Sequence, residues 1–309
     1  MVSRSDFPYS FGWLPDLPDP RDYTSTHPKI APLLAKKPVF TPKSVDLRAF
    51  CPPICDQGQI GSCTANAAAG MLEYYRKRAY GKDSPTSRMF IYKCTRDLMM
   101  AKGDSGAYIR TTMGSLALFG APPEKYWDYD SRALDRAPPA FCYSFAQNYQ
   151  AISYFRLDDP RGQKSTADPP DGSPPQDKQK LALTNIKETL AQQIPAMFGF
   201  QVYESIRESM ALPSVALRRN IRDANDGKIP YPERGEKVIG GHAVLCVGYD
   251  DAMKIGDKVG AFLIRNSWGE GWGEKGYGWL PYNYLLAGLA QDWWALVKAE
   301  WMETGAFGI

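Results

Sequence analysis

Three residues from separate parts of the chain, Cys63, His242 and Asn266, supply the side chains needed for nucleophilic acyl transfer. Cys63 follows a loop with two glycines and opens a strongly helical pattern. Unpaired backbone N–H groups at a helix start favour thiolate over thiol. A histidine can hold this thiolate as an ion pair and later protonate a leaving amine, and an amide oxygen can orient the imidazole. We therefore expect Cys63 to be the nucleophile, His242 the acid and base, and Asn266 the orienting residue.

Gln57 adds a donor to this set, since it lies in the same loop, a few residues before Cys63. A loop of this length can fold the side-chain amide back beside the sulfur, where Gln57 and the backbone N–H of Cys63 would stabilise an oxyanion. Taken singly, Cys63 is more often a buried structural thiol, His242 a core histidine and Asn266 a turn residue. Their joint occurrence, each in the surroundings that the chemistry needs, favours the catalytic interpretation.

The composition of the chain argues against several classes of function. The chain has 309 residues, 44% hydrophobic and 23% charged, as is typical of a soluble globular protein, and its net charge of +3 with no basic run predicts no nucleic-acid partner. No apolar stretch reaches the roughly 18 residues that span a bilayer, so no membrane partner is expected. Only two histidines occur, His27 and His242, and His27 lies in a proline-rich segment. We therefore expect no metal site and no cofactor.

The elements that must position these residues are helices first and strands later. The pattern predicts a helix from Cys63 to about residue 78, a strand entered through two glycines at His242, and a strand that ends at Asn266. This order predicts an α+β fold of two lobes, with a helical N-terminal lobe carrying the nucleophile on a long helix and an antiparallel β C-terminal lobe. The other predicted helices are 87–98, 109–119 and 184–193, and the other strands are 194–202, 260–265, 276–280 and 293–297.

This domain should cover 45–309; one segment precedes it and another is an insertion within it. Residues 1–44 are rich in proline and aromatic residues, so they predict a non-helical strap packed on the body, with a possible short helix at 28–36. Residues 158–180 are polar and rich in Pro, Gly and Asp, which predicts a mobile surface insertion. The region 205–236 is long, charged and ambiguous.

The motifs around these residues resemble those of the papain family of cysteine peptidases. The matching stretches run in the family's order and are Asp56-Gln57-Gly58-Gln59-Ile60-Gly61-Ser62-Cys63, Gly240-Gly241-His242, Asn266-Ser267-Trp268-Gly269, and Trp272-Gly273 with Gly276-Tyr277. The resemblance implies a cysteine endopeptidase that hydrolyses peptide or protein substrates through an acyl-thioester on Cys63. It also implies an inhibitory N-terminal segment, although the family's long helical prodomain is absent. Further implications are that Gly106 offers backbone groups to an extended substrate and that Trp268 borders the site and covers the contact between His242 and Asn266.

Departures from the family pattern leave alternatives open. Ile60 stands where the family usually has a disulfide-forming cysteine, and Thr64 replaces an aromatic residue. The distances along the chain from the nucleophile to His242 (242 − 63 = 179) and to Asn266 (266 − 63 = 203) exceed the roughly 130 to 150 residues of the family. We therefore expect an outlying, bacterial-type branch. A papain-fold protein that binds a peptide or another ligand without cleaving it is the alternative, and exopeptidase or transpeptidase action is a third.

Two features of the sequence point to different cellular compartments. The first residues lack an apolar signal segment. The resemblance, however, implies a disulfide between Cys94 and Cys142, which would favour an exported or extracellular protein. Cys51 and Cys55 could close a small loop.

Overall fold

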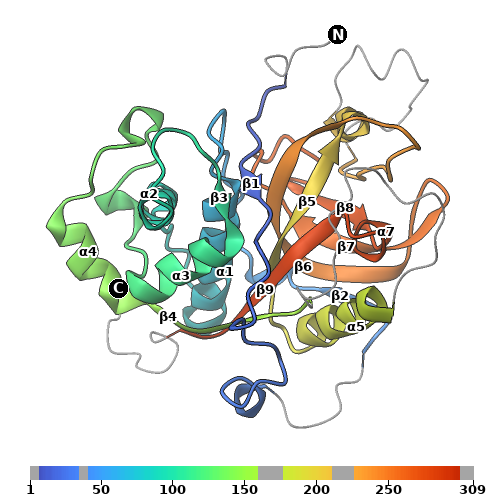
Figure 1. Ribbon diagram of the computed structural model, residues 1–309, viewed down its shortest axis with the longest axis horizontal. Helices are drawn as coiled ribbons and strands as arrows, with labels where there is room; N and C mark the ends of the chain where they lie inside the picture. Colours follow the sequence, from blue (N-terminus) through green and yellow to red (C-terminus); the bar gives the residue numbers. More distant parts are fainter. Residues whose placement is uncertain (1–6, 35–40, 159–176, 211–225, 300–309) are drawn as a thin grey trace.

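The computed structural model describes residues 7–34, 41–158, 177–210 and 226–299. They form two lobes, one helical and one built on a sheet, and the N-terminal segment runs between them (Figure 1). The predicted α+β fold of two lobes is therefore confirmed.

The helical lobe is built around α1 (Cys63–Tyr80), whose residues 63–76 are all buried. Gly81 ends this helix in the left-handed conformation, at a φ of 67°, and its N–H bonds to the Lys77 carbonyl. Ser87 caps the start of α2 by accepting a hydrogen bond from the Phe90 N–H. The helices of this lobe are α1, α2 (Arg88–Leu98), α3 (Ile109–Leu118) and α4 (Ala140–Ala146).

The other lobe contains a seven-stranded antiparallel sheet in the order β4-β9-β5-β6-β7-β8, with β2 also paired to β6. The central strand β6 carries His242, which is opposite Phe200 of β5. The sheet consists of β2 (Ser44–Asp46), β4 (Ala151–Arg156), β5 (Ala196–Tyr203), β6 (Val238–Ile255), β7 (Lys258–Arg265), β8 (Tyr277–Pro281) and β9 (Ala290–Ala299). Two further helices belong to this part of the chain, α5 (Asp177–Ala191) and α7 (Asn283–Leu286).

Smaller elements complete the described chain. A two-stranded parallel sheet joins β1 (Trp13–Leu14) of the N-terminal segment to β3 (Ala107–Tyr108), which directly precedes α3. Single 3₁₀ turns or short 3₁₀ helices occur at η2 (Ala31–Leu33), η3 (Arg48–Phe50), η4 (Glu124–Tyr126), η5 (Ser131–Ala133), η6 (Gln147–Tyr149) and η7 (Glu204–Met210).

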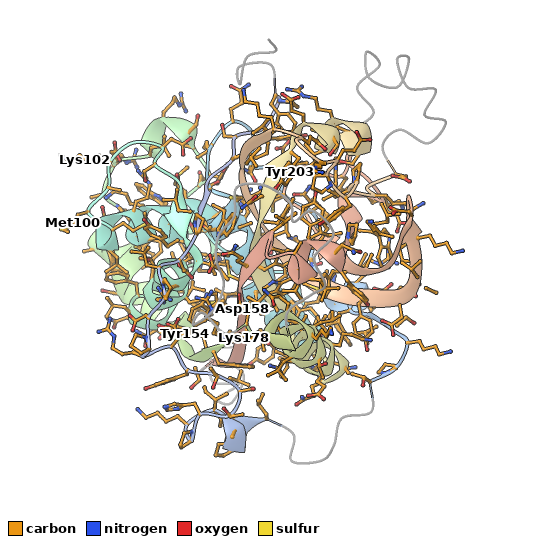
Figure 2. The ribbon with its side chains drawn as sticks, turned by 45° about the vertical axis from the view of Figure 1, so that its right-hand side comes forward. Met100, Lys102, Tyr154, Asp158, Lys178 and Tyr203 are labelled. Carbon is orange, nitrogen blue, oxygen red and sulfur yellow. The ribbon has the colours of Figure 1, made fainter. Side chains whose placement is uncertain are left out.

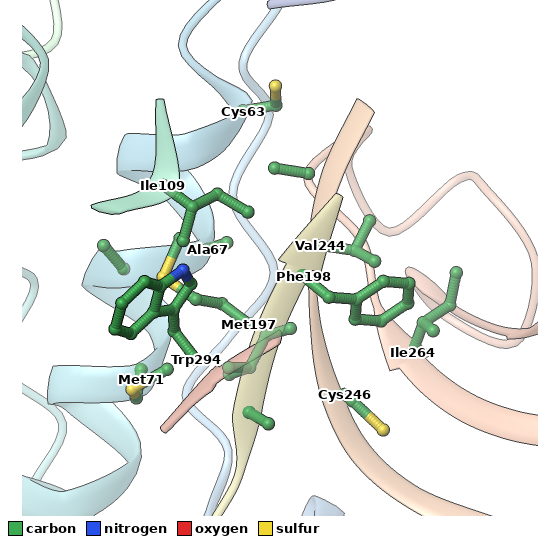
Figure 3. Packing of buried hydrophobic residues seen from close by; sticks show 14 of the residues in the cluster. Cys63, Ala67, Met71, Ile109, Met197, Phe198, Val244, Cys246, Ile264 and Trp294 are labelled. Carbon is green, nitrogen blue, oxygen red and sulfur yellow. The ribbon is translucent and has the colours of Figure 1, made fainter. Parts of the chain in front are cut away.

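The core lies where α1 packs on the sheet (Figure 3). Small residues such as Ala67 and Ala68 let α1 approach β6 closely, and a side chain at Gly70 would meet the Arg265 guanidinium at 2.8 Å. Within the sheet, the rings of Phe198 and Trp293 stack at 3.8 Å. This close packing fixes the first residue of α1 against β6, next to Ala243.

Three predictions about helices and loops need correction. The polar insertion does not extend over 158–180. Asp158, which is labelled in Figure 2, is buried. It accepts a hydrogen bond from Arg156 of β4, and α5 begins at Asp177 rather than at 184. Residues 159–176 lie outside the described residues. The expected helix at 28–36 is a single 3₁₀ turn as far as residue 34, beyond which the segment is not described.

The cysteine pairing is also corrected. Cys94 and Cys142 are both buried free thiols, and so the disulfide that the family resemblance implied is absent. Cys51 and Cys55 are free as well. In the described part of the chain, no helix combines the length and apolarity that crossing a membrane requires.

Candidate active site

Cys63 is the first residue of α1 and is completely buried (Figure 3). The loop before it is held rigidly from the helical lobe, because Asp104 accepts a hydrogen bond from the Gly61 N–H and Tyr129 bonds to the Ser62 hydroxyl. The Ala243 N–H of β6 lies beside the sulfur. The thiol therefore faces the strand that carries His242.

His242 and Asn266 come from neighbouring strands and meet through their side chains. Nε2 of His242 lies 2.8 Å from Oδ1 of Asn266, which also accepts from the Ser267 N–H. Both residues are buried. Since the amide oxygen fixes one imidazole nitrogen, Nδ1 is left for another group, and it has no hydrogen-bond partner among the described residues.

Trp268 covers this pair. Its ring stacks on the His242 ring with 4.7 Å between centroids, and the tryptophan is only 1% exposed. Phe200 contacts the histidine edge-on from β5. The histidine and its amide partner are thus enclosed by aromatic side chains, which exclude water and strengthen their hydrogen bond.

Gln57 lies in the same region, and its side chain is fully engaged. Oε1 accepts from the Ser267 hydroxyl at 2.6 Å, which turns the Nε2 group away from Ser267. Nε2 donates to the Ile60 carbonyl at 2.9 Å and to the Ser10 carbonyl at 3.0 Å. The Ser10 carbonyl belongs to the N-terminal segment, so the amide predicted to serve an oxyanion bonds here to a carbonyl oxygen of the chain itself.

Residues 7–22 are the part of the N-terminal segment that passes directly over Cys63, and from here on we call only these residues the strap. The N–H of Gly12 lies beside the sulfur, and the Gly12 carbonyl accepts from the Ala107 N–H at 2.7 Å. Gly106 makes room for this contact, because a Cβ there would lie 2.5 Å from the Gly12 oxygen. The backbone edge at Gly106 that was predicted to receive a substrate therefore holds the strap.

Aromatic side chains of the strap fill the adjoining surface. Tyr9 stacks on Trp268 at 5.0 Å and donates its hydroxyl to the Trp268 carbonyl. Phe11 lies against Gly240 and faces His242, while Trp13 is inserted into the sheet lobe. A cavity of about 900 Å³ continues alongside these residues, bordered on the body of the protein by Gln59, Asp104, Glu204, Arg207 and Lys237.

Beyond Trp13 the strap is held by buried charges. Asp16 accepts hydrogen bonds from the Arg110 N–H and from the Trp294 indole, and Asp22 pairs with the Arg110 guanidinium at 2.6 Å. Arg156 lies 3.5 Å from Asp22. Arg110 is partly exposed, but Asp16, Asp22 and Arg156 are almost entirely removed from water, so breaking a pair would leave one of these charges buried and uncompensated.

Burial sets the protonation of the pair under the strap. It raises the pKa of the Cys63 thiol to about 11, although the backbone N–H groups of Ala243 and Gly12 oppose the rise. Burial also lowers the pKa of His242 to about 4, against the opposing effect of its bond to Asn266. With the strap in place, the neutral thiol and neutral imidazole are therefore the favoured forms at neutral pH.

The structure brings the six predicted site residues, Gln57, Cys63, Gly106, His242, Asn266 and Trp268, to one cleft between the lobes. His27 is remote from this group and stacks on Tyr23. Sequence reasoning missed Ser267, which orients Gln57, although it stands inside a recognised motif. It also missed Asp292 and Arg156, for which no local pattern gave a signal.

The two-lobed fold and this grouping of thiol, imidazole and amide define a papain-like cysteine peptidase. A family model described as "Papain family cysteine protease" matches residues 224–293. An uncharacterised peptidase C1-like protein of Acanthamoeba polyphaga mimivirus is 31% identical over 308 residues, which cover 96% of this chain and 89% of the relative. Mouse cathepsin K is 26% identical, over 78% of this chain and 60% of its own length.

Among solved structures, xylellain, a cysteine protease from Xylella fastidiosa, superposes with a TM-score of 0.68 at 34% identity. The match covers 93% of this chain and 95% of xylellain. The digestive procathepsin L 3 of Tenebrio molitor shares the fold at a TM-score of 0.54 and 19% identity. The chain therefore belongs to the papain family of cysteine proteases, as its motifs predicted, and its similarity to a bacterial member agrees with the expected branch.

Proposed function

We propose that the full chain is a latent cysteine endopeptidase whose strap blocks its own cleft. The observation that carries this proposal is that the strap uses the groups a substrate would need. The Ser10 carbonyl lies on the Gln57 amide, the Gly12 backbone lies on Cys63 and Ala107, and aromatic rings cover the rest. Such a contact excludes both water and substrate from the thiol.

In the proposed reaction, removal of the strap exposes the cleft and lets Cys63 transfer its proton to His242. The thiolate attacks the scissile carbonyl carbon, and the oxyanion is bound by Gln57 and the Cys63 N–H. His242 then gives its proton to the leaving amine, so the C–N bond breaks and an acyl-thioester remains. Water, deprotonated by His242, attacks the thioester, and the C–S bond breaks to release the acid and restore the thiol.

Asn266 would hold the imidazole in line throughout these steps by accepting from Nε2, which leaves Nδ1 to exchange the proton with the sulfur. Trp268 would keep water from that bond.

The test compares the full chain with a chain cut after folding. A site-specific peptidase sequence placed within residues 35–40 allows the cut and keeps β2 paired with β6. We expect the intact chain to be nearly inactive on fluorogenic peptides and the cut chain to cleave them once the strap dissociates. Cys63→Ala should abolish cleavage. Equal turnover by the intact and cut chains would refute latency, and turnover by the Cys63→Ala variant would refute the mechanism.

A further inference from the structure

The hydroxyl of Tyr129 joins the two ends of the loop that precedes Cys63. It donates to the Gln57 carbonyl at 2.9 Å and lies 2.5 Å from the Ser62 hydroxyl. A tyrosine has a single O–H, and because this one is given to Gln57, the Ser62 hydroxyl donates the second bond. The Ser62 oxygen accepts in turn from Asn66 of α1 at 3.0 Å. One tyrosine oxygen therefore fixes the separation between Gln57 and the residue before Cys63.

A buried arginine holds the ring of Tyr129 in place. The guanidinium carbon of Arg88 lies 4.0 Å from the centre of the ring, and the same guanidinium makes a bidentate pair with Glu124 at 2.8 and 2.9 Å. Its Nη1 also donates to the Asp56 carbonyl at 3.2 Å. Only 9% of the arginine side chain is exposed. Tyr129 thus rests on a fixed group of the helical lobe that also contacts the start of the loop.

The loop relies on hydrogen bonds because cysteine cross-links do not constrain it. Ile60 stands where the family usually has a disulfide-forming cysteine, and all six cysteines of the chain, which lie in its described part, are free. Gly58 adopts the left-handed conformation at a φ of 56°, with open space around it. Ser267 of the sheet lobe orients the side chain of Gln57, whereas Tyr129 holds the carbonyl of Gln57 on the helical lobe.

We propose that Tyr129 is a positioning residue for the oxyanion hole. The Gln57 amide and the Cys63 N–H stand at the two ends of the loop, and both have to point at the same developing oxygen to stabilise it. The Tyr129 hydroxyl holds these ends at the required separation and acts on the reaction only through them. This inference rests on the proposed function, because the oxyanion forms only in the peptidase reaction.

The first experiment measures turnover of fluorogenic peptides by the cut chain carrying Tyr129→Phe, which removes the hydroxyl and keeps the ring on Arg88. Because the oxyanion exists in the transition state and not in the bound substrate, kcat should fall about 10- to 30-fold while KM changes less than about twofold. Deleting an oxyanion donor outright costs more, roughly 10²- to 10³-fold. An unchanged kcat would overturn the proposal.

The matched control is Tyr74→Phe in the same cut chain. Tyr74 is a buried residue of α1 whose hydroxyl donates to the Gln193 carbonyl at 3.0 Å, so this variant also loses one bond between a tyrosine hydroxyl and a carbonyl. Its kcat should stay within about twofold of the parent. An equal loss of kcat in the two variants would mean that Tyr129 serves only the stability of the fold, and would overturn its positioning role.

Two thiol reagents separate the oxyanion hole from the nucleophile. A peptide aldehyde adds the Cys63 thiol across its carbonyl, with the sulfur bonded to carbon and the former carbonyl oxygen in the oxyanion position. Iodoacetamide alkylates the sulfur with loss of iodide and forms no oxyanion. Tyr129→Phe should weaken calorimetric binding of the aldehyde about tenfold and leave the alkylation rate within about twofold. A parallel fall in both would overturn the proposal.

A double-variant comparison tests whether Tyr129 acts through Gln57. In the cut chain carrying Gln57→Ala, the donor that the hydroxyl positions is gone, so adding Tyr129→Phe should lower kcat less than about threefold further. If the further fall is as large as in the parent, the hydroxyl does not act through Gln57 and the assignment is overturned.

The reagents also separate this proposal from the function on which it rests. If the parent cut chain cleaves no peptide, the proposed peptidase activity fails, and the comparison of aldehyde binding with alkylation decides the positioning role by itself. A loss of aldehyde binding alone in Tyr129→Phe then supports the role, and equal effects on both reagents overturn it. A parent cut chain that is alkylated but does not bind the aldehyde has no working oxyanion hole, which overturns both proposals.

Discussion

Replacing Trp13 by alanine should open the cleft without unfolding the protein. The indole is buried against Gly199 and Gly241 and donates to Asp292. Other aromatic side chains of the strap also pack on the sheet lobe, but Trp13, at 4% exposed, is the most deeply buried of them. Truncating a buried tryptophan costs about 3–5 kcal/mol. Since this contact exists only while the strap is docked, the equilibrium between docked and open strap should shift by roughly 10²- to 5 × 10³-fold.

The assay is the labelling rate of Cys63 in the intact chain by a small thiol reagent. Cys63 is completely buried, so labelling requires opening, and its rate follows the open fraction when reclosing is fast. Trp13→Ala should therefore raise the rate by about two orders of magnitude or more. Leu17→Ala is the matched control, because Leu17 lies in the same strap but is 74% exposed, and its effect should stay below about threefold.

Cys246 distinguishes opening of the cleft from unfolding of the protein. It is completely buried in β6, away from the strap. In Trp13→Ala, mass spectrometry should find the label on Cys63 while Cys246 stays unlabelled. If Cys63 labels at the wild-type rate in this variant, Trp13 does not hold the strap. If the two cysteines label together, the reaction reports global unfolding and the reasoning fails.

Three further predictions concern the site itself. Because burial lowers the pKa of His242 from 6.5 to about 4, the folded chain binds fewer protons there than the unfolded chain; this contribution to stability is complete above pH 6.5 and is lost as the pH falls toward 4. Urea unfolding should show wild type losing about 2–3 kcal/mol relative to His242→Gln between pH 7 and 4.5, and parallel curves would contradict this. In the cut chain, Asn266→Ala should lower kcat at least about tenfold, since the imidazole loses its orienting acceptor, and an unchanged kcat would exclude that role. Gly106→Ala should speed labelling of the nucleophile in the intact chain, because the new Cβ would meet a strap carbonyl, whereas Gly103→Ala has a similar positive φ with open space around it and should not.

The part of the site that could be predicted from sequence is the part carried by dense local motifs. Cys63, His242 and Asn266 each stand in a distinctive stretch, and the elements around them follow helical and strand periodicity closely. The structure brings these three regions together, and α1 begins at the expected residue. Local patterns sufficed here because each residue's position depends on the element that carries it.

Prediction failed for two reasons. In one region the composition of a helix start was that of a loop, and elsewhere the position of a residue depends on a partner far away in the sequence. The proline-rich, polar run before α5 resembled a loop throughout, so the start of the helix at Asp177 was missed. Asp158 was assigned to the same loop because its partner Arg156 was not recognised as buried. Asp16 and Asp292 lie 276 residues apart along the chain, and no pattern within either segment indicates their contact.

The strap affects the proposed chemistry through protonation as well as through steric exclusion. With the strap docked, burial raises the pKa of Cys63 to about 11 and lowers that of His242 to about 4, so proton transfer from the thiol to the imidazole is strongly unfavourable before their mutual attraction is counted. Burial is the main cause of both shifts, and the strap supplies part of it. Its departure would let water reach the cleft, bring the two pKa values together and stabilise the ion pair. Latency and activation would then be two consequences of one solvation change at Cys63, which is why the labelling rate of that thiol can report both.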